Sequence, residues 1–289
     1  MPHQNAALAP SNLRPPSLAF GDVSVELSPQ QALKFTPDVK VLPLGTRIFL
    51  THLSSAALPV QVEAAARLQA MGYSPVPHLA ARNFVSVAEF VEHLAAHGRN
   101  GISQALFLGG NPLISTGPLT EAAMLLSHPA MAQSSIRTAF IGGYPEGHSA
   151  IAPDVLGDAL KRKLARCAEL GIKPHIVSQF AFDGEVMAAW ARRLQSEHPG
   201  LAVRIGLAGV TSLPQLIKFA AMCGVGPSLA ALKRSGTGLF NVLSDRDPAD
   251  LIETIEAAYP KPAGPLDIHF FPFGGWQKTS DWLAGYRSR

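Results

Sequence analysis

The residues of this sequence that could do chemistry follow short apolar runs. In "IGGYPEGHSA" (141–150), two glycines, Tyr144, Glu146 and His148 come directly after such a run. Glycines let the backbone approach a ligand, and the phenol, carboxyl and imidazole groups can bind it or exchange protons with it. The same pattern recurs along the chain at Glu26, His52, His78, Arg82, Asn111, Gln179 and Asp183. This set suits acid–base chemistry on a polar ligand if the fold brings it together.

Glu26 is the strongest candidate for an acid or base. In "VSVELSP" (23–29), the neighbouring Val25 and Leu27 would point to the opposite face of a strand, so the carboxyl would point into the interior. A buried carboxylate is costly, and a structural role would need a basic partner that the sequence does not identify. We therefore favour a functional role for Glu26.

The other polar residues fit several roles. A lone histidine such as His52 or His78 is as often a structural donor as a ligand contact. Several histidines and a glutamate could also bind a metal, but barrel metallohydrolases usually carry His-x-His on one strand, and no such pair occurs here, so we expect no metal. Gln179, a neutral donor and acceptor on an apolar run, would suit a fused heterocycle.

Eight short apolar, β-branched runs must position these residues. They begin at Val23, Arg47, Ser74, Gln104, Arg137, Lys173, Ala202 and Asp267. Helical patterns lie between them, for example behind a Ser86-x-x-Glu89 capping box. Strand-then-helix repeated eight times favours an α/β fold, a single-domain (β/α)8 TIM barrel, whose carboxyl strand ends share one mouth. The alternative is an open doubly wound sheet, but no GxGxxG follows the first strand.

Composition sets the remaining expectations. The 289 residues are 47% hydrophobic and 16% charged, which is typical of a globular chain, and a net charge of +3 with scattered Lys and Arg gives no reason to expect nucleic acid. No apolar run approaches the ~20 residues of a membrane helix, and two isolated cysteines favour reduced core thiols in the cytoplasm. We expect a flexible N-terminal tail over 1–17 and the barrel catalytic domain over 18–289. Helix faces rich in Ala and Leu favour a homo-oligomer.

Several motifs, in order along the chain, resemble those of one family, the methylenetetrahydrofolate reductases. "VSVELSP" (23–29) looks like their first-strand motif, "PHL" (77–79) like their third-strand histidine motif, and "GGYPEGH" (142–148) like their fifth-strand loop. "LKRK" (160–163) with "SQFAFD" (178–183) is similar to their "LKxK…QFFFD", and "IHFFPFG" (268–274) to their last strand. Together the matches span nearly the whole chain after residue 17.

The resemblance implies a barrel enzyme of one-carbon metabolism and methionine biosynthesis. Such an enzyme reduces 5,10-methylenetetrahydrofolate to 5-methyltetrahydrofolate, or runs the reverse, with electrons from NADH or NADPH and usually through bound FAD. Glu26 matches the general acid that protonates N10 of the folate. The expected substrate contacts are Gln179, Asn111 and Phe182. The positions matching flavin contacts are His78, Tyr144, His148 and Lys163.

Two departures from the family pattern make FAD doubtful. Where the family's fourth strand ends in Arg-Gly-Asp, this chain has Gly109-Gly110-Asn111, and "PLISTGPLTEAAMLL" lacks the Tyr-Ala-x-Asp pattern that holds the flavin. These changes remove charge-assisted contacts to a pyrophosphate. Flavin-independent reductases resemble the chain in "THL" (51–53) and "PHLAAR" (77–82), which makes His52 and Arg82 expected cofactor contacts. The rival interpretations are a folate-binding methyltransferase on a TIM barrel and a non-catalytic folate-binding protein.

Overall fold

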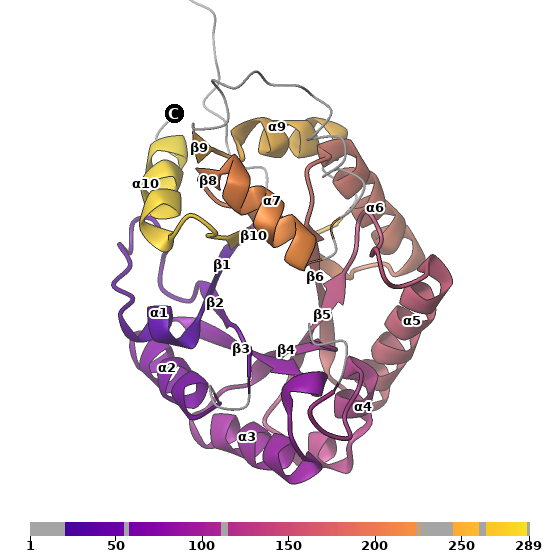
Figure 1. The fold of residues 1–289 in the computed structure, drawn as a ribbon. Coiled ribbons are helices and arrows are strands. Elements are labelled where there is room, and N and C mark those ends of the chain that lie inside the picture. The colour runs from indigo at the N-terminus through magenta and orange to yellow at the C-terminus, as the bar shows by residue number, and fades with distance from the viewer. Residues whose placement is uncertain are drawn as a thin grey trace, which may run out of the picture.

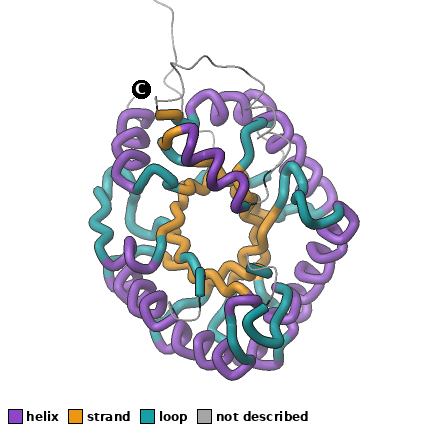
Figure 2. Tube along the Cα trace, in the orientation of Figure 1, coloured by secondary structure: helices purple, strands orange, loops and turns teal. Residues whose placement is uncertain are grey.

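The computed structural model describes residues 21–54, 58–110, 115–223, 225, 245–259 and 264–287. The expected tail (1–17) and Asn111 lie outside the described residues. Eight parallel strands close into a barrel in the order β1-β10-β7-β6-β5-β4-β3-β2. Figure 2 shows these strands as an inner ring surrounded by helices. The protein is therefore the single-domain (β/α)8 barrel that the sequence predicts.

The strand bounds agree with the predicted runs to within a residue at their starts. The barrel strands are β1 (Val23–Leu27), β2 (Arg47–Leu50), β3 (Ser74–Ala80), β4 (Gln104–Leu108), β5 (Thr138–Gly143), β6 (Lys173–Phe180), β7 (Ala202–Ala208) and β10 (Leu266–Phe271). A short antiparallel pair, β8 (Thr211–Ser212) and β9 (Asp245–Arg246), lies outside the barrel.

The outer ring consists of α1 (Pro29–Leu33), α2 (Leu58–Ala70), α3 (Val87–Arg99), α4 (Ala122–Ser127), α5 (Pro153–Glu169), α6 (Gly184–Glu197), α9 (Ala249–Ala258) and α10 (Trp276–Arg287) (Figure 1). Another described helix, α7 (Leu213–Met222), packs on the rim beside β6 and β10. Within the described ranges, no helix has both the length and the apolar character needed to cross a bilayer.

Helix starts follow the predicted caps. The Ser86 hydroxyl accepts the backbone N–H of Glu89 at 3.1 Å, and the Asp183 carboxylate accepts that of Val186 at 3.0 Å. Such a cap stabilises a helix by about 1 kcal/mol, because it satisfies a backbone donor that has no partner within the helix. Both helices thus begin shortly after a strand, β3 or β6, whose end places polar residues at the mouth.

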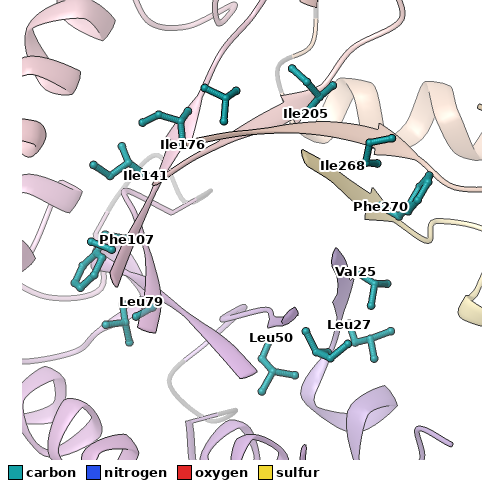
Figure 3. Close-up of a cluster of buried hydrophobic side chains, with 14 of the residues drawn as sticks. Val25, Leu27, Leu50, Leu79, Phe107, Ile141, Ile176, Ile205, Ile268 and Phe270 are labelled. Carbon is teal, nitrogen blue, oxygen red and sulfur yellow. The ribbon is translucent and has the colours of Figure 1, made fainter. Parts of the chain in front are cut away.

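The two faces of each strand pack into different cores. Outward side chains pack against the helices, and ten of them are labelled in Figure 3: Val25, Leu27, Leu50, Leu79, Phe107, Ile141, Ile176, Ile205, Ile268 and Phe270. A smaller cluster fills the centre of the barrel with Phe49, Val76, Leu106, Phe140 and Val177. Because side chains alternate along a strand, each inward position near a strand's carboxyl end faces the mouth.

Charged groups occupy the amino-terminal end of the barrel. The guanidinium of Arg204, only 1% exposed, donates from Nη2 to the Asp267 carboxylate at 2.7 Å and from Nη1 to the Ser24 hydroxyl at 3.0 Å. Arg47 pairs with Asp22 at 3.4 Å nearer the surface. We call these four ionised residues, Asp22, Arg47, Arg204 and Asp267, the floor of the barrel.

Candidate active site

Glu26 lies near the carboxyl end of β1 and faces the barrel interior, as the alternation predicts. Its Oε2 lies 3.4 Å from His78 Nε2 of β3 and 4.0 Å from His269 Nε2 of β10. The side chain is 21% exposed, so a ligand can reach it. Burial raises the pKa of Glu26, and this outweighs the opposing effect of His78. The carboxyl therefore keeps its proton to higher pH than an exposed glutamate does.

The two histidines beside Glu26 are neutral. Burial lowers the pKa of His78 to about 4 and that of His269 to about 3. The structure thus supplies the partners that the sequence did not identify, but they are imidazoles and not cations. Neither can balance a carboxylate at neutral pH, so the effect of burial on the Glu26 pKa prevails.

A line of polar contacts connects this pair to the floor. His269 Nδ1 lies 2.9 Å from the Ser24 hydroxyl, which accepts a hydrogen bond from Arg204. Since Arg204 can only donate, Ser24 can direct its own proton to His269 Nδ1 or to the carbonyl of Ile268 at 3.2 Å. Sequence reasoning missed His269 and Ser24 as site residues. Alternation along "DIHFF" and "VSVEL" places both inward and could have identified them.

Arg82, Tyr144 and His148 come together from the loops after β3 and β5. The Tyr144 and His148 rings are perpendicular, with centroids 5.6 Å apart. Burial raises the pKa of Tyr144 and lowers that of His148, and the Arg82 charge favours the tyrosinate and disfavours the imidazolium. Arg82 also donates to the carbonyl oxygens of Gly110 at 2.8 Å and Thr120 at 2.9 Å. Its guanidinium thus binds the backbone both directly after β4 and directly before α4.

Gln179 and Phe182 lie at the end of β6, the strand next to β5 in the barrel. The β6–β7 register shifts between Val177 and Phe180, and such a bulge redirects the side chains within it. Gln179 Nε2 donates to the carbonyl of Cys223, which follows α7. Phe182 contacts the Phe180 ring, with centroids 5.8 Å apart. Phe180 and Phe182 also belong to one apolar cluster with Ala220 of α7, so the rim of β6 is joined to α7 by polar and apolar contacts.

His52 and Lys163 are not brought to Glu26. Leu50 faces the helices, so His52, two residues later, does the same: its ring contacts Phe84, with centroids 4.8 Å apart, and its Nδ1 accepts the N–H of Ala80 at 3.2 Å. The two-residue period explains this placement, and the expected contact of His52 with a cofactor stays a prediction. Lys163 lies on α5, where burial lowers its pKa to about 8 against the opposing charge of Glu121.

The described part of the chain holds no group of three His, Cys, Asp or Glu side chains arranged to bind a metal ion. Asn111, an expected substrate contact, lies outside it. The geometry instead defines a candidate acid site, Glu26 with His78 and His269, and two flanking groups on the rim of the same mouth.

Comparison with known proteins places the chain in a fold class. No family model matches it. Among solved structures it is similar to a Clostridium thermocellum protein that binds two copies of 5-methyl-5,6,7,8-tetrahydrofolic acid, with 11% identity, 93% of this chain and 94% of that chain covered, and a TM-score of 0.60. A GH18 chitinase from Pseudoalteromonas aurantia gives 9% identity over 93% of this chain and 99% of that chain, with a TM-score of 0.49. At this identity, the first similarity shows a shared barrel fold.

Proposed function

We propose that this protein reduces 5,10-methylenetetrahydrofolate to 5-methyltetrahydrofolate with NADH or NADPH. The observation that carries the proposal is the Glu26 carboxyl, whose pKa burial raises, at the mouth of a barrel and reachable by a ligand. Folate as substrate is supported by the motifs around Glu26, His78, Tyr144 and Gln179. It is also supported by the Clostridium thermocellum protein, which has the same fold and binds 5-methyltetrahydrofolate.

In this reaction Glu26 acts as a general acid. It donates its proton to N10 of the folate, the bond between N10 and the bridging methylene breaks, and the electron pair stays on N10. The resulting 5-iminium carbon accepts hydride from the dihydronicotinamide and becomes the N5-methyl group, while the dinucleotide leaves oxidised. The Glu26 carboxylate then takes a proton from solvent. A positioned acid of this kind accelerates a reaction about 10²–10⁴-fold.

The neutral histidines suit this chemistry. A cation next to Glu26 would lower the pKa of its carboxyl and would repel the iminium cation that forms beside it. Because the pKa values of His78 and His269 are lowered to about 4 and about 3, both are uncharged near neutral pH. They can hydrogen-bond to the carboxyl without removing its proton. We propose that Gln179, Phe182 and Asn111 contact the pterin.

We further propose that hydride passes directly from the nicotinamide, without FAD. The support is the sequence: where the flavin-binding pattern of the family has Arg-Gly-Asp, this chain has Gly109-Gly110-Asn111, which removes a cation and a carboxylate from that position. His78, Tyr144, His148 and Arg82 then become candidate contacts to the dinucleotide.

A methyltransferase is the second candidate, because 5-methyltetrahydrofolate, the ligand of the Clostridium thermocellum protein, is also a methyl donor. The test is NADH and NADPH consumption by the purified protein with methylenetetrahydrofolate and no added flavin, alongside a visible spectrum. Folate-dependent consumption by a colourless sample supports the proposal. A yellow active sample overturns direct transfer. Absence of consumption, even with FAD added, overturns the reductase and leaves methyl transfer or binding.

A further inference from the structure

Behind His78, outside the barrel, lies a buried polar group that the proposed reaction does not use. It consists of Gln61 on α2, which is 1% exposed, and the buried His93 and His97 on α3. These side chains lie between the helices and the carboxyl ends of β2 and β3. Since burying polar groups costs free energy unless they are hydrogen-bonded, their contacts show what they hold in place.

Gln61 connects two strands to a helix. Its Nε2 donates to the carbonyl oxygens of Leu50 at 2.9 Å, Thr51 at 3.1 Å and His78 at 3.2 Å. Carbonyl oxygens only accept, so this end of the amide is the NH2 group and Oε1 faces α3. There Oε1 accepts from His93 Nε2 at 2.7 Å, with His97 Nε2 at 3.2 Å.

These bonds continue the sheet where its backbone ladder stops. The pairing of β2 with β3 ends at Leu50 and Pro77, whereas β3 runs on to Ala80 beside β4. Beyond Pro77, therefore, β3 has no β2 residue in register on that side. The Gln61 amide bridges the gap, and one of the carbonyls it binds belongs to His78.

Two further side chains connect the segments of β2 and β3 that lie beyond their ladder. His52 Nδ1 accepts the N–H of Ala80 at 3.2 Å, and Asn83 Nδ2 donates to the carbonyl of His52 at 2.6 Å. His52, expected from the sequence as a cofactor contact, thus has an architectural position. Of these side chains, only Gln61 bonds directly to the backbone of His78.

We propose that Gln61 is a positioning residue for the Glu26–His78 pair: by tying β2 to β3 beyond the end of their ladder, it holds the His78 imidazole against the Glu26 carboxyl. The catalytic consequence rests on the acid role proposed for Glu26, whereas the positional consequence does not. Without this tie between β2 and β3, water would reach His78, and the 3.4 Å distance between His78 Nε2 and Glu26 Oε2 would vary.

Gln195 provides a matched control at the opposite end of the barrel. It is a buried glutamine on α6, its Nε2 donates to the carbonyls of Leu201 at 3.1 Å and Pro265 at 2.8 Å, and its Oε1 accepts from the Tyr259 hydroxyl. Leu201 and Pro265 immediately precede β7 and β10. Gln195→Met therefore removes the same kind of amide as Gln61→Met, but at the amino-terminal strand ends.

The first readout is the His78 pKa, followed by NMR of the imidazole C–H in ligand-free protein and assigned with His78→Gln. Burial lowers this pKa to about 4. In Gln61→Met we expect it to rise by about one unit or more, because desolvation shifts reverse when water enters. In Gln195→Met we expect no change. An unchanged value in both variants, or an equal rise in both, overturns the positioning role.

The second readout is turnover with NADH. We expect kcat to fall on the order of 10²-fold in Gln61→Met, since small misplacements cost that much, with little change in the folate KM and wild-type kinetics in Gln195→Met. Equal losses in the two variants overturn the inference. A His78 shift confined to Gln61→Met, in a protein that shows no reductase activity, leaves the positioning intact and removes the proposed function. If Gln61→Met does not fold, Gln61→Asn, which withdraws the amide by one methylene, replaces it.

Discussion

At the floor of the barrel, the buried Arg204 guanidinium faces the Asp267 carboxylate at 2.7 Å, whereas at the mouth the Glu26 carboxyl faces the two neutral imidazoles of His78 and His269. Both ends bury ionisable groups in the same closed barrel. Burial lowers the pKa of Arg204 to about 10, and Asp267 opposes that change, so the guanidinium stays charged. At the mouth, the described residues around Glu26 supply no Lys or Arg charge against burial, and burial raises the pKa of the carboxyl.

The difference separates a structural use of charge from a chemical one. Opposite charges held together offset part of the cost of burying each other, and the result is an inert pair. A carboxyl with neutral neighbours keeps a proton that a ligand can take. The ion pair acts within the folded protein alone, whereas the carboxyl can act only on a ligand that binds at the mouth.

Removing the carboxyl at the mouth should have the largest effect. Glu26→Gln keeps the shape and polarity of the side chain but has no proton to donate, so we expect turnover to fall about 10²–10⁴-fold while the folate Kd changes little. Steady-state NADH consumption and folate titration measure the two quantities. Glu92→Gln, at an exposed position on α3, is the control and should match wild type. Undiminished turnover in Glu26→Gln would remove the acid role.

Breaking the buried ion pair of the floor should instead lower the unfolding free energy without lowering the turnover of folded protein. Asp267→Asn leaves the Arg204 charge buried without its closest partner, which typically costs about 3–5 kcal/mol of unfolding free energy. Asp22→Asn, at an exposed pair, should cost no more than about 1 kcal/mol. Urea unfolding measures both. The distinction between the ends fails if the two variants are equally stable, or if folded Asp267→Asn loses turnover as Glu26→Gln does.

The sequence predicted the barrel and the inward direction of Glu26 because both depend on short-range patterns. Apolar runs bounded by turn residues gave all eight strands, and alternation around Glu26 gave its inward direction. The same two-residue period, counted on from Leu50, would have turned His52 away from the mouth; the resemblance to another motif led to the opposite expectation. The role of each residue in catalysis stays a prediction.

Contacts between distant elements could not be predicted in this way. Gln61 lies in an ordinary helical stretch, and nothing in "LPVQVEAAARLQA" shows that its amide meets two strand ends and two histidines of the next helix. The pairing of Arg204 with Asp267 likewise joins strands far apart in sequence. Such contacts depend on barrel closure, which sequence periodicity specifies only after the register is known.

Acid should distinguish the regions further, because most of the described buried histidines lie behind or within the mouth, whereas His175 lies near the floor residues Arg47 and Arg204. Burial lowers the pKa of His97 to about 4, against about 6.5 in an unfolded chain. The unfolded state then binds more protons below about pH 6.5, so the stability contributed by neutral His97 is complete above that pH and is lost as the pH falls towards 4. The loss is up to about 1.4 kcal/mol per pH unit.

His97→Gln tests this sign. Urea unfolding near pH 7 and near pH 5 should show a smaller drop in unfolding free energy for His97→Gln than for wild type, by about 2 kcal/mol. Glu26 acts in the opposite direction, since its raised pKa means that the folded state holds its proton more tightly, but it is present in both proteins. Equal drops would mean that His97 titrates normally and is not buried as a neutral base.

The smallest expected effect comes from separating the two ends at Ser24, whose hydroxyl joins His269 to Arg204. Ser24→Ala should cost about 1 kcal/mol in unfolding free energy, since Arg204 Nη1 still lies 3.5 Å from the carbonyls of Asp22 and Ile268. Turnover should fall by less than about tenfold, because Glu26 keeps its own carboxyl and both imidazoles. If Ser24→Ala instead abolished turnover while leaving stability unchanged, the floor would be part of the catalytic proton path. The floor and the mouth would then both take part in catalysis, and the distinction between them would be wrong.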